Sequence, residues 1–311
     1  MQRRVFVGTV FSALASVASA QPPKPKSGGI ATRPVGRTGD KVTMIGMGGA
    51  RFHLIPFEEG TALVRRAYDL GINYFDMARG YNNGHAEEVY GAVIPEFRKN
   101  IFLTSKTGQR TRQGAEADLE KSLKAMRTDH LDLWQMHSVG TKKDIASILA
   151  PGGALEAFVA AKKAGKVRFI GFTGHADPDI NLQLLRSFDG YDTVFMPLHL
   201  ADTAYMSFEK GTLPAAVERG MGVFAMKIFA SAYNLRAFSV RDCLSYTLTL
   251  PISGAALGFT TMGQLEDDVR IAQNFKPRSN EEMDAIRVHA SMKHREVNFG
   301  PTLEYWKVKD Q

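Results

Sequence analysis

Four side chains able to carry or shift a proton follow segments that have the composition of buried strands. Asp76 ends the aromatic segment NYFD, and Tyr81 follows it in a glycine-containing loop. Lys106 ends the segment IFLTSK, and His137 ends LDLWQMH. A carboxylate at the end of a buried strand costs free energy unless it has a partner. We therefore expect Asp76 to support another charge.

These four residue types together can form a proton-transfer site for a carbonyl compound. A tyrosine hydroxyl titrates at about 10 when unperturbed, and a neighbouring ammonium group lowers that pKa. Lys106 can supply the ammonium group, and Asp76 can keep it charged and oriented. His137 can then donate a hydrogen bond that places a carbonyl oxygen beside the Tyr81 hydroxyl. The predicted catalytic residues are therefore Asp76, Tyr81, Lys106 and His137.

Each of the four residues also has an ordinary structural interpretation. Tyr81 alone would be a loop tyrosine, and Lys106 alone a strand-end lysine with its ammonium group in solvent. His137 alone would be a satisfied structural histidine, and Asp76 could cap the next helix. Four such groups in this order, at the ends of successive predicted strands, favour the catalytic interpretation.

The elements that must position these residues alternate regularly along the chain. Short segments rich in β-branched or aromatic residues predict eight strands: Met44–Gly48, Asn73–Met77, Ile101–Lys106, Leu131–His137, Phe169–Thr173, Thr193–Met196, Gly222–Lys227 and Gly254–Gly258. Amphipathic segments between them predict helices, among them Glu58–Leu70, Ala115–Met126, Gly153–Ala164 and Met262–Asn274. The pattern predicts an α/β fold, a (β/α)8 TIM barrel, whose strands gather their C-terminal ends at one mouth.

Two further features refine this fold prediction. A doubly wound sheet is disfavoured because no G-x-G-x-x-G fingerprint opens a helix after the first predicted strand. The segment RPVGRTGDKVTMI predicts a hairpin at the bottom of the barrel, with arms at Arg33–Val35 and Lys41–Thr43. We also expect a C-terminal helical extension after the barrel.

The composition is that of a folded chain without a nucleic-acid-binding surface. Of the 311 residues, 44% are hydrophobic and 23% charged, and 39 basic against 32 acidic residues give a formal net charge of +7. The basic residues are spread along the chain without aromatic platforms, so we expect no nucleic-acid partner. The single cysteine, Cys243, excludes an internal disulfide and a zinc site of the CxxC type. We predict no bound metal.

The N-terminal segment MQRRVFVGTVFSALASVASA is typical of a bacterial export signal. It has a basic start, a short apolar run and an A-x-A cleavage pattern ending at Ala20. Arg3 and Arg4 resemble the twin-arginine signal, which predicts the export machinery as a partner and a periplasmic location. The alternatives are an uncleaved membrane anchor or a signal for the unfolded-chain pathway. We therefore assign residues 1–20 to a signal peptide, 21–32 to a linker and 33–311 to the barrel domain.

The residues from Arg33 to the helix after Thr261 resemble the aldo-keto reductase superfamily. The segment FDMARGY is similar to the family's aspartate-to-tyrosine motif, and Lys106 and His137 complete its catalytic tetrad. The resemblance implies a nicotinamide-dependent enzyme that reduces an aldehyde or ketone, with Tyr81 as the proton donor. NADP(H) is the cofactor that the resemblance favours, and NAD(H) is the alternative.

The positions that correspond to the family's nicotinamide cradle depart from its pattern. The usual serine and asparagine after strand five are Thr173 and Gly174 here, and the usual strand-six glutamine is Phe195. The stacking tyrosine on strand seven is Met226, followed by Lys227. We expect Thr173, Met226 and Lys227 to contact the cofactor, because a methionine can still pack on a ring face.

The segment GFTTMGQLEDDV is similar to the loop and helix that hold the adenosine phosphate end in this family. It predicts cofactor contacts from Gly258, Thr260, Thr261, Gln264 and Asp267. The family's arginine for the 2′-phosphate is replaced by Gln264, which leaves NADH possible. The alternative is an ordinary amphipathic barrel helix.

Two other functions are compatible with the same residues. Lys106 could form a Schiff base in an aldolase. A barrel that binds the cofactor and senses redox state, with little turnover, is also compatible with the altered cradle. In every case we expect the loop Asp202–Gly211 and the tail from Arg295 to set substrate choice.

Overall fold

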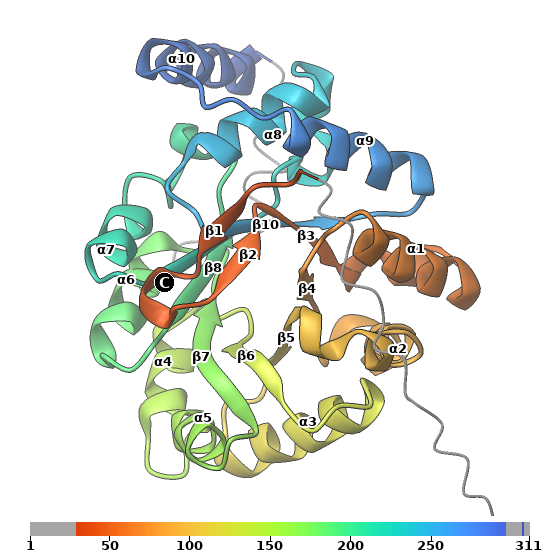
Figure 1. The fold of residues 1–311 in the computed structure, drawn as a ribbon. Helices are drawn as coiled ribbons and strands as arrows, with labels where there is room; N and C mark the ends of the chain where they lie inside the picture. The colour runs from red at the N-terminus through yellow and green to blue at the C-terminus, as the bar shows by residue number, and fades with distance from the viewer. Residues whose placement is uncertain (1–28, 297–306, 308–311) are drawn as a thin grey trace, which may run out of the picture.

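Eight parallel strands close into a barrel, as predicted (Figure 1). The computed structural model describes residues 29–296 and Lys307, so the predicted signal peptide and most of the linker lie outside the described residues. In barrel order the strands are β3 (Ile45–Gly48), β4 (Tyr74–Asp76), β5 (Phe102–Thr107), β6 (Leu131–Met136), β7 (Val167–Thr173), β8 (Thr193–Pro197), β9 (Gly222–Met226) and β10 (Gly254–Gly258). Strand β10 pairs with both β9 and β3, which closes the barrel.

A ring of helices covers the outside of the barrel, and side-chain caps begin several of them. The helices are α1 (Phe57–Asp69), α2 (His85–Gly91), α3 (Arg112–Ala125), α4 (Lys142–Leu149), α5 (Ala154–Lys163), α6 (Pro178–Ser187), α7 (Thr212–Glu218), α8 (Val240–Thr249), α9 (Met262–Gln273) and α10 (Asn280–Glu296). Capping boxes at Thr141 and Ser239 begin α4 and α8. Helix α10 confirms the C-terminal helical extension.

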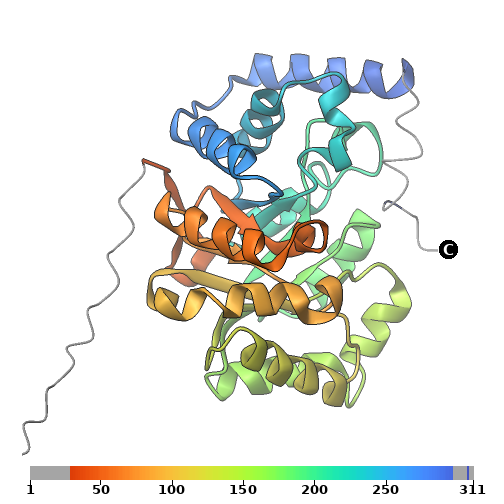
Figure 2. The same cartoon turned by 90° about the vertical axis from the view of Figure 1, so that its right-hand side faces the viewer.

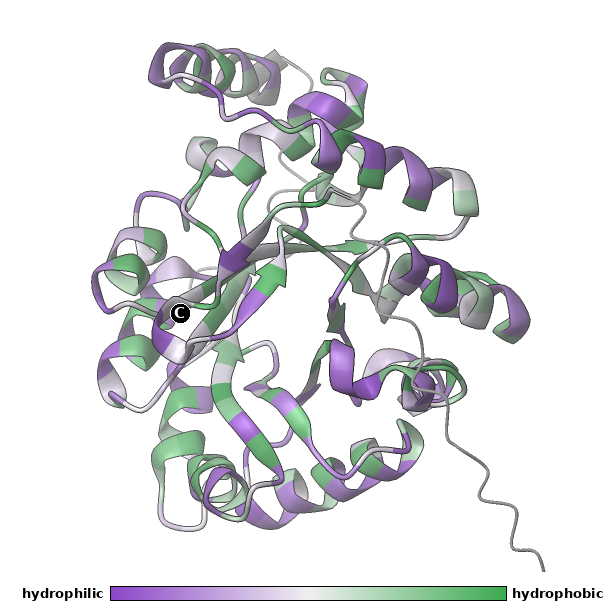
Figure 3. Cartoon of the chain, in the orientation of Figure 1, coloured by the Kyte–Doolittle hydropathy of each residue, from purple (hydrophilic) through white to green (hydrophobic). Residues whose placement is uncertain are grey.

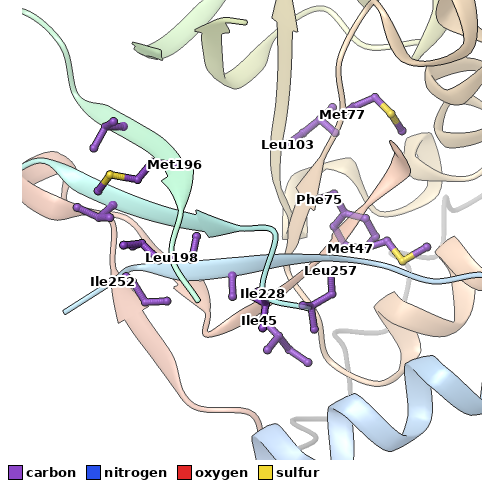
Figure 4. Close-up of a cluster of buried hydrophobic side chains, with 14 of the residues drawn as sticks. Ile45, Met47, Phe75, Met77, Leu103, Met196, Leu198, Ile228, Ile252 and Leu257 are labelled. Atoms are coloured by element: carbon purple, nitrogen blue, oxygen red, sulfur yellow. The ribbon is translucent and has the colours of Figure 1, made fainter. Parts of the chain in front are cut away.

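The core fills the layer between the strands and the helices. Outward-facing side chains of neighbouring strands, including Met47, Phe75, Leu103 and Met196, are fully buried and belong to one cluster (Figure 4). The outer helices alternate apolar and polar residues, so that only one side of each is apolar (Figure 3). Within the part of the chain that the structure describes, no helix is both long and apolar enough to cross a membrane.

The predicted hairpin closes the bottom of the barrel. Strands β1 (Thr32–Pro34) and β2 (Lys41–Thr43) pair antiparallel and lie at the opposite end from the strand C-termini (Figure 2). Val35 and Val42 are fully buried and pack in the cluster of side chains inside the barrel. Gly36 has a φ of +50°, and a Cβ there would lie 2.3 Å from the backbone nitrogen of Gly222, so the turn requires glycine.

Candidate active site

Asp76 and Lys106 form a buried ion pair at the mouth of the barrel. Asp76 is in register with Thr104 on the neighbouring strand, which places Lys106, two residues further on, on the same inward face. The Lys106 Nζ donates hydrogen bonds to both Asp76 carboxylate oxygens, each at 2.7 Å, and to the Met77 carbonyl at 2.6 Å. Burial lowers the pKa of Lys106, while the Asp76 charge opposes this shift.

Tyr81 lies against this ion pair, in the loop that leaves β4. The Lys106 Nζ is 5.2 Å from the centre of the Tyr81 ring. Burial, together with the Asp76 charge, raises the pKa of Tyr81 above its ordinary value. The expectation that Lys106 lowers this pKa is therefore wrong for this structure, because the Lys106 ammonium is directed at Asp76 and the Met77 carbonyl. The phenol stays protonated at neutral pH, as a proton donor requires.

His137 completes the group from the next strand. It follows β6 directly, and its backbone N–H donates to the Thr107 carbonyl at 2.8 Å. Its imidazole meets the Tyr81 ring edge to face, with the ring centres 5.6 Å apart. Burial, and then the Lys106 charge, lower the pKa of His137 to about 3. A neutral imidazole keeps one N–H that can donate to a carbonyl oxygen. The structure thus brings all four predicted residues together.

Phe195 forms the inner wall of this site. Its side chain is nearly fully buried inside the barrel, where Met226 packs against the same cluster. The Lys106 Nζ lies 5.3 Å from the centre of the Phe195 ring, which is within the range of a cation–π contact. The residue that replaces the family's glutamine therefore supports Lys106 from within the barrel.

Thr173 lies inside the protein and does not reach the surface of the mouth. It is fully buried, and its hydroxyl accepts a hydrogen bond from the Ser138 backbone N–H at 2.8 Å. In this structure the Thr173 hydroxyl holds the loop after β6, and the cofactor contact expected from this side chain stays a prediction. Ser138 has a left-handed φ of 52° and approaches the His175 Nε2 at 3.3 Å.

The packing around Gly174 leaves no room for the asparagine that the family usually has at this position. A Cβ at Gly174 would lie 2.0 Å from the Asn181 Oδ1 and 2.7 Å from the Val139 carbonyl oxygen. No larger side chain fits there without movement of the backbone. His175, the next residue, is partly buried, and burial followed by the Lys227 charge lowers its pKa to about 4.

The predicted phosphate loop lies at the start of α9 and is exposed. The Thr261 hydroxyl caps the helix by accepting from the Gln264 N–H at 3.2 Å. In return, the Gln264 side-chain oxygen accepts from the Thr260 N–H at 2.9 Å and from its hydroxyl at 3.0 Å. Gln264 therefore acts as a cap, while Asp267 pairs with Arg270 at the surface.

Arg51 is a cation at this end of the site that the sequence did not reveal. It lies in the 3-10 helix Gly49–Leu54 after β3, and its side chain crosses Gly258, where a Cβ would lie 2.8 Å from the Arg51 Cγ. Lys227, just beyond β9, is exposed and has a left-handed φ of 60°. Partial desolvation, and then the Arg51 charge, lower the pKa of Lys227. Arg51 and Lys227, from distant segments, are therefore close enough to interact, and Arg51 lies beside the end of β10.

These residues offer donors for anions and no metal site. Among the described residues, no three histidine, cysteine, aspartate or glutamate side chains lie together as metal ligands would. Guanidinium and ammonium groups beside a helix N-terminus favour phosphate groups. The donor set therefore fits a phosphate-bearing dinucleotide.

Comparison with known proteins agrees with this geometry. The profile of the Aldo/keto reductase family matches residues 44–238. The chain is 33% identical to the uncharacterized oxidoreductase YqkF of Bacillus subtilis over 124 residues, which are 36% of this chain and 39% of that protein. It is 30% identical to L-galactose dehydrogenase of Arabidopsis thaliana over 161 residues, 47% of this chain and 49% of that enzyme. These matches span half or less of the relatives' length.

Solved structures share the whole fold. The aldo-keto reductase AKR11C1 from Bacillus halodurans, in its holo form, superposes with a TM-score of 0.70 at 20% identity, covering 83% of this chain and 96% of that one. An aldo-keto reductase from Klebsiella pneumoniae in complex with NADPH gives a TM-score of 0.69 at 22% identity, covering 84% and 96%. At this level of identity the likeness establishes the fold.

Proposed function

The chain belongs to the aldo/keto reductase family, and from this premise we propose that it reduces an aldehyde or ketone to an alcohol. The observation that carries the proposal is the convergence of four groups at the barrel mouth. A neutral phenol and a neutral imidazole face the same space beside a buried lysine–aspartate pair. This arrangement supplies one proton donor and one hydrogen-bond donor for a carbonyl oxygen.

Each residue has a separate role in the proposed reaction. Tyr81 gives its proton to the carbonyl oxygen as the oxygen becomes an alkoxide, and general acid catalysis of this kind contributes about 100-fold to 10,000-fold. The His137 N–H orients the same oxygen. Lys106 supports the Tyr81 ring through a cation–π contact, and Asp76 holds Lys106 in place. The nicotinamide cofactor, when bound, supplies the hydride.

We propose NADP(H) as the cofactor, held at its phosphate groups by Arg51, Lys227 and the start of α9. The Thr261-capped helix presents backbone N–H groups, and Arg51, which interacts with Lys227, lies beside Gly258 at the strand end that precedes this helix. Met226, partly buried at the end of β9, would pack against the nicotinamide ring. The similar fold that binds NADPH in the Klebsiella pneumoniae enzyme supports this choice over NAD(H).

Cofactor titration of an arginine variant tests this assignment. Loss of a charged hydrogen bond costs about 1.5–3 kcal/mol, so Arg51→Leu should raise the Kd for NADPH by roughly 10-fold to 100-fold and the Kd for NADH by less. The matched control is Arg186→Leu, because Arg186 is an exposed arginine near the end of α6. Equal affinity of the Arg51 and Arg186 variants for NADPH would remove Arg51 from the cofactor site.

The two alternative functions predict different results in one assay. An aldolase needs Lys106 as a free amine, but its ammonium group is bound to Asp76 and the Met77 carbonyl. Borohydride trapping with substrate should therefore leave Lys106 unmodified, while NADPH absorbance falls in the presence of aldehydes or ketones. Tight NADPH binding without turnover over a broad carbonyl panel would instead favour the redox-sensing barrel.

Export to the periplasm is a separate proposal that rests on residues 1–20. The paired Arg3 and Arg4, the apolar run and the A-x-A pattern support it. Expression of the whole chain in a bacterial host should yield a periplasmic protein whose N-terminal residue is Gln21, and Arg3→Lys with Arg4→Lys should keep it in the cytoplasm. A full-length protein in the cytoplasmic fraction of the unaltered strain would exclude export in that host.

A further inference from the structure

The loop that carries Tyr81 is bound to the barrel by an ion pair outside the catalytic group, between the half-buried Arg79 and the buried Glu87. The Arg79 Nη1 donates to the Glu87 Oε2 at 2.7 Å, and its Nη2 donates to the Asn83 carbonyl at 3.0 Å. Glu87 is fully buried at the start of α2, and its other oxygen accepts from the Ser105 hydroxyl at 2.7 Å. The Arg79 guanidinium group therefore connects the residues before and after Tyr81 to Glu87, and Glu87 in turn bonds to the middle of β5.

The anchor on β5 lies directly beside Lys106 in the sequence. Ser105 faces outward and Lys106 faces inward, because alternate residues of a strand point to opposite faces. The Arg79 backbone N–H also donates to the Lys106 carbonyl at 2.9 Å. Two contacts therefore fix the position of the Tyr81 loop relative to Lys106. One is the backbone hydrogen bond of Arg79, and the other is the bond between Glu87 and Ser105.

The loop has a backbone conformation that needs such an anchor. Asn82 and Asn83 both have left-handed φ values, 47° and 53°. Left-handed conformations cost free energy in residues other than glycine, and they persist where surrounding contacts hold them. Gly84, with a φ of +93°, leaves room for the guanidinium, since a Cβ there would lie 2.0 Å from the Arg79 Nη2. The left-handed residues of this loop and the close contact at Gly84 both lie next to the Arg79 side chain, which can therefore hold the loop in this conformation.

We propose that Arg79 and Glu87 are positioning residues that hold the Tyr81 hydroxyl at the distance and angle needed for proton transfer. Neither side chain bonds to a side chain of the catalytic group. Arg79 therefore acts through the Tyr81 loop, and Glu87 acts through the same contact and through its charge near Lys106. The inference rests on the proposed carbonyl reduction. A displacement of about 1 Å at a reacting group can cost on the order of 100-fold in rate. Loss of the pair should therefore lower kcat while cofactor binding stays intact.

Steady-state kinetics of Arg79→Met, Arg79→Lys and Glu87→Gln test the proposal. We expect Arg79→Met to lower kcat by about 100-fold with little change in the Kd for NADPH, and Arg79→Lys to recover part of the loss. The double variant Arg79→Met with Glu87→Gln should be no slower than the worse single variant, because both act through one contact.

The control is a second, largely buried ion pair at the other end of the barrel. The Arg98 Nη1 lies 2.8 Å from the Asp132 Oδ2, and both side chains are largely buried. Arg98→Met should lower Tm as Arg79→Met does, yet leave kcat nearly unchanged. Equal kcat losses in the two variants, in proportion to their Tm losses, would overturn the positioning role.

Amide hydrogen exchange tests the anchoring of the Tyr81 loop independently of carbonyl reduction. Amides of residues 78–84 should exchange at least 10-fold faster in Arg79→Met than in the unaltered protein, whereas Arg98→Met should leave them unchanged. If the unaltered protein reduces no carbonyl compound, the proposed function fails, and the exchange result still decides whether the pair anchors the loop. Unchanged exchange in Arg79→Met would exclude the anchor.

Discussion

Two buried lysine–aspartate pairs lie on the mouth side of this barrel, and only one of them belongs to the catalytic group. Lys106 pairs with Asp76 at 2.7 Å, and Lys307 pairs with Asp202 at 2.6 Å. Each ammonium also lies over an aromatic ring. Each pair has a nearby histidine, and burial followed by the lysine charge lowers the pKa of both histidines. By ion-pair geometry alone the two sites are alike.

The neighbours of each pair make the difference. Lys307 directs its remaining hydrogen bonds to backbone carbonyls, of which that of Tyr205 is 2.8 Å away. Asp202 also accepts from the Ser207 hydroxyl and the Glu209 N–H. This second pair joins the tail to the loop after β8, so the two segments expected to set substrate choice contact each other. In this protein, a buried lysine–aspartate pair belongs to the candidate catalytic site only where a partly exposed proton-carrying group lies beside it.

The histidines beside the two ion pairs, His137 and His199, differ in their exposure to solvent. His137 and Tyr81 are partly exposed at the mouth, whereas His199 is fully buried. The first pair of rings therefore has some contact with solvent. The second cluster can contribute to stability but has no open side for a substrate.

The largest expected effect comes from removing the hydroxyl of Tyr81. Tyr81→Phe should lower kcat/KM for carbonyl reduction by about 100-fold to 10,000-fold, because the proton donor is lost. Tyr68→Phe is the matched control, since Tyr68 lies near the end of α1 and its hydroxyl accepts from Asn100, which precedes β5. Its kcat/KM should stay within about 2-fold of the unaltered value. Initial rates of NADPH oxidation measure both. A fully active Tyr81→Phe variant would assign the proton to another group.

The next largest effect is expected from replacing each buried lysine by methionine, which should affect stability at both positions and activity at only one. Lys106→Met leaves the Asp76 charge buried without its partner, which should lower the free energy of unfolding by about 3–5 kcal/mol and abolish turnover. Lys307→Met should lower it by less, roughly 1–3 kcal/mol, because Asp202 keeps two hydrogen bonds, from Ser207 and Glu209. Asp76 keeps one, from the Thr104 hydroxyl.

Urea unfolding and initial rates, measured on both lysine variants, check this separation. Lys307→Met should retain kcat within a few-fold of the unaltered value even where its unfolding midpoint falls. Loss of turnover in folded Lys307→Met, with an unchanged Kd for NADPH, would show that the second pair also shapes the catalytic site.

The smallest effect is a pH dependence shared by both clusters. The folded-state pKa of His137 is about 3, below its unfolded value of about 6.5. Between these values the unfolded chain binds a proton that the folded chain does not, so stability falls as pH falls below about 6.5 and is constant above it. A fully buried histidine such as His199 contributes at most about 1.4 kcal/mol per pH unit, and the partly exposed His137 less.

Thermal unfolding between pH 7 and pH 4 tests the two histidines separately. His199→Gln should flatten the fall in Tm and leave carbonyl reduction near its original rate. His137→Gln should flatten the Tm profile less and lower kcat/KM. Since His137 is neutral from pH 5 to 8, its titration should not appear in the pH–rate profile over that range. A limb in that range that disappears in His137→Gln would contradict the lowered pKa.

Much of the fold was predictable because its signals are local. Each strand reads as a short apolar run bounded by turns, and all eight predicted strands overlap observed ones with ends that differ by at most two residues. The four candidate catalytic residues were predictable for a related reason. They stand at strand ends, and parallel strands in a closed barrel place those ends at one mouth.

The hydrogen bonds and ion pairs of buried side chains could not be predicted, because they depend on where each side chain points after packing. The sequence places Lys106 near Tyr81, but only the structure shows that its ammonium is directed at Asp76 and Met77, which reverses the expected direction of the Tyr81 shift. It likewise shows that Thr173 holds an internal loop and that Arg51 lies over Gly258 at the end of β10.

The sequence by itself therefore determined the strand order, the hairpin at the barrel bottom and the residue types that meet at the mouth. The tertiary structure alone decided which cations remain available to a ligand, which carboxylates are neutralised, and that Arg79 binds the Tyr81 loop. Strand identity follows from neighbours within a few residues. Hydrogen-bond partners and pKa shifts follow from contacts between segments far apart in the chain, which no local pattern records.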